Sequence, residues 1–164
     1  VELLNDQVNK EFYSAYLYLS MANYYNEEGL SGFGNWFTIQ AQEERDHAML
    51  FLEYLQNNGA HVELKTVEAP KKQFKEFKDP LNESLKHERY VTASIHNIYA
   101  AASNVKDFRT MQFLDWFVKE QGEEEKTAED LIKKLELFGQ DGKGLYMLDS
   151  ELASRTYSAP TLTL

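Results

Sequence analysis

The sequence predicts an all-α protein: a four-helix bundle with a long crossover between the second and third helices and a short fifth helix near the C-terminus. Three observations lead to this prediction. Apolar residues recur at alternating steps of three and four along four long segments, which is the spacing of helices packed nearly parallel. Only 3 prolines and 8 glycines interrupt the 164 residues. No segment has the strict apolar–polar alternation of a half-buried strand.

Capping and stop signals indicate where the helices begin and end. We expect Gly29 to end the first helix, Ser31 to cap the second and Gly59 to end it. Asp79 and Pro80 form a good start for the third helix, because an N-cap is followed by proline at the first helical position. The expected helices cover residues 3–28, 31–58, 80–103, 107–138 and 145–154.

Residues 60–78 show no clear period and contain Pro70, so we interpret them as a long crossover. Such a crossover allows the third helix to lie parallel to the second instead of folding straight back. The tail at residues 158–160 is predicted to be frayed or disordered. We treat residues 1–164 as a single domain, since one core of this length is usual.

The overall composition argues against several classes of partner and site. A net charge of −10 disfavours binding to nucleic acid or to an anionic membrane, both of which attract a basic face. The absence of cysteine excludes disulfides and thiolate metal ligands. No apolar run approaches the ~18 residues that span a bilayer. Since the opening residues also do not resemble a signal peptide, we expect a cytoplasmic protein.

Each of the four long helices has a polar interruption in its apolar stripe. The interruptions are Glu11 in the first helix, Glu44 and His47 in the second, Glu88 in the third, and Gln121 and Glu124 in the fourth. The second helix pair repeats the first with a shift of 77 residues, so every interruption has a counterpart. Two helical hairpins packed as a bundle would therefore bring these groups to one level.

Buried carboxylates at one level need positive charge. A single buried glutamate is most simply an accident of register or a partner in a structural ion pair. Four carboxylates facing one another would repel strongly in a low-dielectric core, and no lysine or arginine lies on any of the stripes. Carboxylates with one imidazole suit iron or manganese better than zinc. The set therefore predicts a site for a pair of divalent ions.

Three further acidic residues flank this set, namely Glu43, Glu120 and Glu123. They form either a solvated helix face or, with Glu124, an additional cation site. Tyr18 has two interpretations as well: a hydrogen bond to a ligand carboxylate or a redox role, or a core position with a satisfied hydroxyl. Trp116 has the same ambiguity. The histidines off the stripes are interpreted as ordinary polar residues; they are His61, His87 and His96.

Several segments combine into a pattern that is more specific than any one motif. They are Asn5-Asp6-Gln7 through Glu11, Ala41-Gln42-Glu43-Glu44 with His47, Lys86-His87-Glu88, Phe113-Leu114-Asp115-Trp116-Phe117, Glu120 through Glu125, and Gly144-Leu145-Tyr146. Over nearly the whole chain this pattern resembles the prokaryotic non-haem ferritins. The resemblance implies a ferritin-like bundle that assembles into a hollow homo-oligomer of 24 subunits. It also implies iron storage and detoxification by a ferroxidase, which oxidises Fe(II) with O2 or peroxide and deposits hydrated ferric oxide inside the shell.

The resemblance also implies a set of iron ligands. One iron would be held by Glu11, Glu44 and His47. The other would be held by Glu44, Glu88 and Glu124, with Glu44 bridging and Gln121 close by. The family's third iron site would correspond to Glu43, Glu120, Glu123 and Glu124, and its tyrosine near the dinuclear centre to Tyr18.

Two departures from related patterns change what is expected. Gln121-x-x-Glu124 stands where the di-iron pattern has a second Glu-x-x-His, so the second ion would have fewer or weaker protein ligands. Arg45 stands where haem-containing bacterioferritins have their axial methionine, so no haem is expected.

Two other functions are compatible with such a bundle. One is a di-iron oxidase that acts on an organic substrate or electron partner, which the fold alone does not separate from storage. The other is a non-catalytic assembly protein whose acidic core no longer binds metal. The additional glutamates favour iron traffic over the first function, and the intact ligand set counts against the second.

Overall fold

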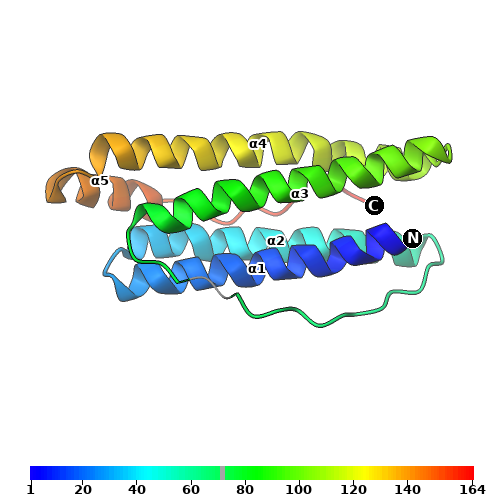
Figure 1. Ribbon diagram of the computed structural model, residues 1–164, viewed down its shortest axis with the longest axis horizontal. Coiled ribbons are helices and arrows are strands. Elements are labelled where there is room, and N and C mark those ends of the chain that lie inside the picture. Colours follow the sequence, from blue (N-terminus) through cyan, green and yellow to red (C-terminus); the bar gives the residue numbers. More distant parts are fainter. Residues whose placement is uncertain (71–72) are drawn as a thin grey trace.

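The helices of the computed structural model pack side by side along one long axis (Figure 1), and residues 1–70 and 73–164, which the structure describes, contain no strand. The helices are α1 (Glu2–Glu27), α2 (Ser31–Asn57), α3 (Lys78–Asn104), α4 (Phe108–Phe138) and the short α5 (Gly142–Ala153). Helices α1 and α2 form one hairpin, α3 and α4 form the other, and α3 runs parallel to α2 (Figure 1). The predicted fold class is confirmed. No helix within the described ranges combines the length and the apolar character needed to cross a lipid bilayer.

The crossover between α2 and α3 runs along the outside of α1 (Figure 1). The side chain of Asn5 donates to the carbonyl oxygen of Glu63 at 3.0 Å and accepts from the amide of the same residue at 2.9 Å. Lys65 pairs with Asp6 at 2.6 Å. The two bonds of Asn5 satisfy backbone groups of Glu63, in a stretch at residues 60–70 that has no regular structure of its own. The predicted crossover includes positions 71 and 72, which lie outside the described residues.

Gly29 and Gly59 follow α1 and α2, as predicted, with φ angles of +85° and +71°, a conformation that glycine adopts without strain.

The starts of two helices differ from the prediction. Ser31 does not cap α2 but is its first residue. The backbone amide of Phe33 donates instead to the carboxylate of Asp149 at 2.9 Å. A side chain of α5 therefore accepts the hydrogen bond at the start of α2 that Ser31 was expected to accept.

Asp79 is not the N-cap of α3 either, since the helix begins one residue earlier. Its carboxylate accepts from the amides of Lys75 and Glu76 at 2.9 and 2.8 Å, so it stabilises the preceding turn. These two bonds also hold the pKa of Asp79 below its ordinary value. At the start of α4, Asp107 does cap the helix by accepting from the amide of Thr110 at 3.1 Å.

Helix α5 and the tail behind it are fastened to the bundle. A Cβ atom added at Gly32 would lie 1.7 Å from the carbonyl oxygen of Asp149, so only glycine allows α5 to approach α2 this closely. The tail then turns back along the bundle (Figure 1), where Arg155, Tyr157 and Thr161 bond to side chains of α2 and α4. The tail was predicted to be frayed, but it is held on both sides of residues 158–160.

The core consists of two apolar clusters at different levels of the bundle. Tyr25, Phe33 and Phe37 lie in the cluster near α5, and Phe51 and Phe117 lie in the cluster at the opposite end. Every long helix passes from one cluster to the other across the positions of its polar interruptions. The polar side chains therefore form one layer inside the bundle.

Candidate metal centre

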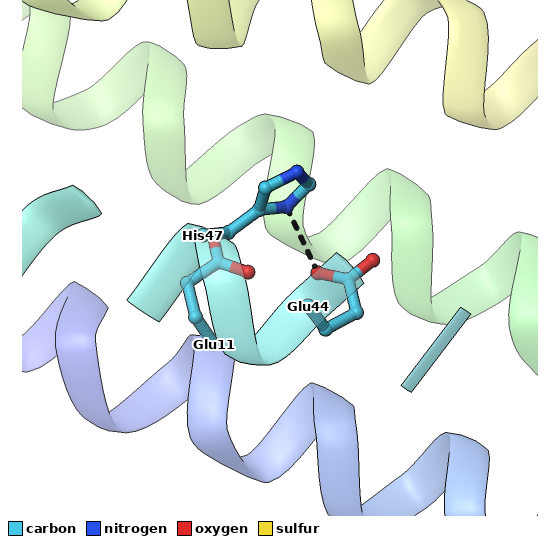
Figure 2. Close-up of side chains that lie close together, drawn as sticks. All are labelled: Glu11, Glu44 and His47. Atoms are coloured by element: carbon cyan, nitrogen blue, oxygen red, sulfur yellow. Dashed lines mark hydrogen bonds and ion pairs between the residues drawn. The ribbon is translucent and has the colours of Figure 1, made fainter. Parts of the chain in front are cut away.

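Two groups of side chains in this polar layer can each hold a metal ion. The first consists of Glu11 from α1 with Glu44 and His47 from α2, which point toward one another (Figure 2). One ligand atom from each lies within 4.8 Å of the others. The two glutamates are 1% exposed and the histidine is 2% exposed. The group therefore presents carboxylate oxygens and one imidazole to an enclosed point.

Glu11 lacks half of the hydrogen bonding that a buried carboxylate needs. Its Oε1 accepts from Nε2 of Gln7 at 2.9 Å, whereas its Oε2 is buried with no hydrogen-bond partner. An unsatisfied buried acceptor costs about 1–3 kcal/mol, and more when it is charged. Burial, followed by the negative charge of Glu44, raises the pKa of Glu11 well above its ordinary value. A cation bound between these side chains would supply the missing partner.

The second group consists of Glu44, Glu88 and Glu124, whose ligand atoms also lie within 4.8 Å of one another. Glu44 belongs to both groups and can therefore bridge two ions. Glu44 and Glu88 are buried, whereas Glu124 is partly exposed. The second group is all-oxygen and less enclosed than the first.

Two donors fix the orientation of Glu88. The hydroxyl of Tyr18 donates to its Oε1, and Nε2 of Gln121 donates to its Oε2 at 3.1 Å. Burial raises the pKa of Glu88, and these two hydrogen bonds lower it. Gln121 thus turns its amide nitrogen, which cannot bind a cation, toward the candidate ligand. In this arrangement Gln121 orients Glu88.

Within the layer, the nearest cationic partner among the described residues is His47, whose Nδ1 lies 3.2 Å from Oε2 of Glu44 (Figure 2). Burial first, and then the charge of Glu88, raises the pKa of both Glu44 and Glu124 well above the ordinary value. Burial and the same neighbour raise the pKa of the Tyr18 phenol, which keeps it protonated as a donor. In the part of the chain that the structure describes, no lysine or arginine forms an ion pair with the four candidate carboxylates.

The flanking carboxylates lie beside this centre but do not converge on a single point. Glu43, Glu120 and Glu123 line a pocket of about 370 Å³ together with His47 and tail residues 158–161. Glu43 forms an ion pair with Arg155. Within the described residues, these carboxylates are not among the groups whose ligand atoms lie within 4.8 Å of one another.

Comparison with known proteins identifies the family of this chain. The family model described as a ferritin-like domain matches residues 1–138. The chain belongs to the ferritin-like family. A bacterial non-heme ferritin of Staphylococcus aureus (strain USA300) is 40% identical over 157 residues, which cover 96% of this chain and 95% of that protein. The corresponding protein of Campylobacter jejuni is 41% identical over 149 residues, which cover 91% and 89%.

Solved structures of ferritins are similar throughout. An open-pore ferritin of the hyperthermophilic archaeon Archaeoglobus fulgidus has a TM-score of 0.93 at 45% identity and is covered to 95%, as is this chain. A closed form of the A. fulgidus ferritin, engineered by site-directed mutagenesis, has a TM-score of 0.93 at 44% identity with 96% of each chain covered. The resemblance to non-haem ferritins is thereby confirmed.

Sequence reasoning missed a polar residue of this candidate centre. Gln40 is 2% exposed, and its Nε2 donates to Oε1 of Glu44 at 3.1 Å and to Oε2 of Glu124 at 2.8 Å. The signal was its position one helical turn before Glu44, on the same face of α2. Glutamine is common on exposed helix faces, so this spacing alone did not distinguish it.

The interpretation of His87 as an ordinary polar residue was wrong. It is 7% exposed, and its Nε2 lies 2.6 Å from Oγ of Ser14 on α1. Its ring also packs edge-on to Tyr18, with centroids 6.2 Å apart. The buried face of α3 is wider than a single stripe, because the helix contacts both α1 and α4. His61 and His96 are exposed, as expected.

Trp116 connects the centre with the tail. Its indole Nε1 donates to Oγ1 of Thr161 at 3.0 Å, and its ring packs edge-on against His47 with centroids 5.6 Å apart. The sequence left two interpretations: a hydrogen bond to a ligand carboxylate or a redox role, or core packing. In the structure Trp116 is partly buried and packs against the cluster of Phe51 and Phe117, and its indole bonds to the tail.

Proposed function

We propose that this ferritin-like chain stores and detoxifies iron by binding two Fe(II) ions, oxidising them and depositing hydrated ferric oxide inside a shell of identical subunits. The observation that carries the proposal is the pair of ligand groups that share Glu44. Glu11 and His47 complete the first group, and Glu88 and Glu124 complete the second. One carboxylate common to both groups would hold two ions close enough to react together.

The chemistry of these side chains suits iron. Carboxylate oxygens with a single imidazole bind iron and manganese well, whereas structural zinc sites use thiolates or more imidazoles. The open Oε2 of Glu11 and the raised pKa values of the carboxyls favour any process that brings positive charge into the layer. Metal binding would release the protons that these carboxyls hold.

Oxidation would then proceed by electron transfer from two bound substrate ions. Each Fe(II) loses one electron, and O2 takes up two electrons and two protons to form hydrogen peroxide. Peroxide as oxidant takes up two electrons and two protons to form two waters. The protein would hold both ions and orient its carboxylates, with Tyr18 and Gln121 fixing Glu88. The Fe(III) product would move on to the mineral.

The acidic pocket beside His47 is the place we propose for a third iron on this route. Glu120 and Glu123 line it together with Glu43, and Glu124 of the dinuclear centre lies one residue further along α4. The assembly that collects the mineral is proposed as a shell of 24 copies. Exposed apolar side chains such as Leu19 and Tyr146, 46% and 73% exposed, offer surface that neighbouring copies would cover.

Addition of Fe(II) in air to wild type and to Glu44→Ala tests this proposal, with ultraviolet absorbance to follow oxidation and size-exclusion chromatography to locate the iron. Glu53→Ala is a matched control, because Glu53 is an exposed glutamate on the same helix. We expect Glu44→Ala to oxidise iron at least about tenfold more slowly, while Glu53→Ala matches wild type.

Iron that elutes with a very large particle of wild type would support storage. Equal oxidation by wild type and Glu44→Ala would mean that this centre is not the catalyst. Fast oxidation without an iron-loaded particle would instead favour an oxidase that acts on an organic substrate or electron partner.

A further inference from the structure

The amide of Gln40 lies between two carboxylates of the proposed second iron site. Its Nε2 donates to Glu44 at 3.1 Å and to Glu124 at 2.8 Å, so both amide hydrogens are directed at candidate ligands. The opposite orientation of the amide would point its oxygen at the same carboxylates. Once the two carboxyls ionise to bind metal, two negative groups and a carbonyl oxygen would then face one another in a layer that is almost closed to water. The function of Gln40 thus depends on which way its amide is turned.

Arg155, in the tail behind α5, contacts the other end of this amide. Its Nη2 donates to Oε1 of Gln40 at 3.1 Å. A guanidinium has donors and no acceptor, so it can bond the amide oxygen but not the amide nitrogen. Bonding to Arg155 therefore selects the orientation in which Nε2 faces Glu44 and Glu124. A chain of hydrogen bonds runs from the tail to two carboxylates of the centre.

The guanidinium is itself held by three further contacts. Nη2 pairs with Glu43, and Nη1 donates to the carbonyl oxygen of Trp36 at 3.0 Å. The Cζ atom lies 4.3 Å from the centre of the Trp36 ring. A planar group with one face on the Trp36 ring and both terminal nitrogens bonded loses little freedom when it binds the amide of Gln40. These contacts position the guanidinium before any metal is bound.

A simpler explanation is that Arg155 only attaches the tail to the bundle. The tail has other attachments, however: Tyr157 donates to Asp46, Trp116 donates to Thr161, and Asn35 donates to the carbonyl oxygen of Arg155. None of these bonds involves Gln40, and Trp116 packs against His47 of the first ligand group, not against the second group. A change at Tyr157 can therefore separate attachment of the tail from orientation of the amide.

We propose that Arg155 is a positioning residue for the second metal site, acting through Gln40 on Glu44 and Glu124. This inference rests on the proposed function, since it concerns the same centre. Hydrogen-bonding partners of metal ligands typically contribute 10–100-fold to metal affinity. The tail, whose residues 158–160 were predicted to be frayed or disordered, thereby becomes part of what shapes the centre.

The test uses Co(II), whose visible absorption reports the ligands of each bound ion and requires no turnover. The full-length protein is titrated as wild type, Arg155→Met, Gln40→Met and the double variant. Methionine keeps the approximate length of both side chains while removing the polar head. We expect each single variant to bind one of the two Co(II) ions about tenfold more weakly and to change the band of that ion only. The double variant is expected to be no weaker than Gln40→Met, because both residues act along one path.

Two controls make the result specific. Tyr157→Phe removes another attachment of the tail and is expected to bind both ions as wild type does. Arg155→Lys keeps a positive charge beside Glu43 without the planar fork, and it is expected to show the same loss as Arg155→Met. It also provides a second variant if Arg155→Met does not fold, which circular dichroism would reveal.

The outcomes distinguish failure of this inference from failure of the proposed function. A wild type that binds no Co(II) at the carboxylate layer would overturn both. Two ions bound equally well by wild type and Arg155→Met would overturn only the role of Arg155. Three results would each overturn the path through Gln40. They are additive losses of Co(II) affinity in the double variant, wild-type affinity in Arg155→Lys, and a loss in Tyr157→Phe equal to that in Arg155→Met.

Discussion

The two hairpins of the bundle place equivalent backbone positions at the centre but carry different side chains there. From α1 and α2 come Glu11, Glu44 and His47, and their counterparts 77 residues further on are Glu88, Gln121 and Glu124. The first trio is almost completely buried and contains an open carboxylate oxygen. In the second trio, Gln121 carries an amide instead of a carboxylate, and Glu124 is partly exposed.

Hydrogen-bond donors explain much of this difference. Glu88 receives bonds from Tyr18 and Gln121, whereas Glu11 receives one from Gln7. The position that corresponds to Tyr18 in the second hairpin is Ile95, which has no donor to offer. One hairpin thus leaves ligand atoms open for a metal, and the other holds its glutamate in place before a metal arrives. A repeated sequence pattern does not imply two equivalent metal sites.

The largest effect is expected when the counterpart residues Glu44 and Gln121 are each replaced by alanine. Glu44→Ala removes a ligand from both groups and should weaken binding of both Co(II) ions by more than about 100-fold, since even partners of ligands cost 10–100-fold. Gln121→Ala removes only a donor to Glu88 and should weaken one ion by about tenfold. Isothermal titration of the metal-free protein measures both. Equal losses in the two variants would mean that Gln121 is itself a ligand.

A smaller contrast is expected between His47→Gln and Glu124→Gln, the other pair of counterparts. His47→Gln replaces the imidazole of the first group and should alter the absorption band of the ion that has a nitrogen ligand. Glu124→Gln should leave that band unchanged and weaken the other, all-oxygen ion by about tenfold. Visible absorption of Co(II) follows the two ions separately. Loss of the same band in both variants would contradict the assignment of the two groups.

Much of the fold was predictable because helix periodicity and glycine stop signals are local. The helix ends lie within three residues of their predicted positions, and the polar layer follows from residue spacing alone. The caps at Ser31 and Asp79 were wrong because the deciding partners lie elsewhere: Asp149 accepts from the backbone at the start of α2, and Asp79 serves the preceding turn. The contact between Asp149 and the start of α2 spans more than a hundred residues and leaves no local trace, whereas the amides that Asp79 accepts from lie three and four residues before it.

The supporting side chains of the centre were less predictable than its candidate ligands. Glutamate on an apolar stripe is conspicuous, so the candidate ligands could be named from the sequence. Gln40, His87 and Arg155 are residue types that are common on surfaces, and only the packing of α1, α3 and the tail shows what they touch. Periodicity identifies a helix face but not the neighbour that covers it.

The metal-free protein should lose stability as the pH rises above the ordinary carboxyl value of 4.5. A raised pKa means that the folded state still holds a proton which the unfolded chain has released, so stability falls between the unfolded and the folded pKa. A folded pKa that lies one pH unit above the unfolded pKa corresponds to a loss of about 1.4 kcal/mol across that interval. Glu11→Gln should flatten this dependence more than Glu88→Gln. At Glu11 the charge of Glu44 adds to burial in raising the pKa, whereas at Glu88 the bonds from Tyr18 and Gln121 offset part of the effect of burial.

Thermal unfolding of the metal-free variants between pH 5 and pH 8 measures this difference. Saturating Co(II) should reverse the trend, since the ions replace the protons. Parallel curves for wild type and Glu11→Gln would show that Glu11 ionises normally in the folded state.

The smallest effect on metal binding is expected from removal of the Tyr18 hydroxyl, a donor that has no counterpart in the second hairpin. Tyr18→Phe removes the bond to Glu88, and Tyr25→Phe is a matched control because its buried hydroxyl donates to the carbonyl oxygen of Phe77, in the apolar cluster. Each substitution should lower the free energy of unfolding by about 1 kcal/mol, the usual contribution of one such bond. Only Tyr18→Phe should also weaken binding of one Co(II) ion, by a few-fold, because Gln121 still holds the other oxygen of Glu88. If both variants bind metal as wild type does, Tyr18 contributes to the core alone, and the asymmetry of the two hairpins lies in Gln121 and Glu124.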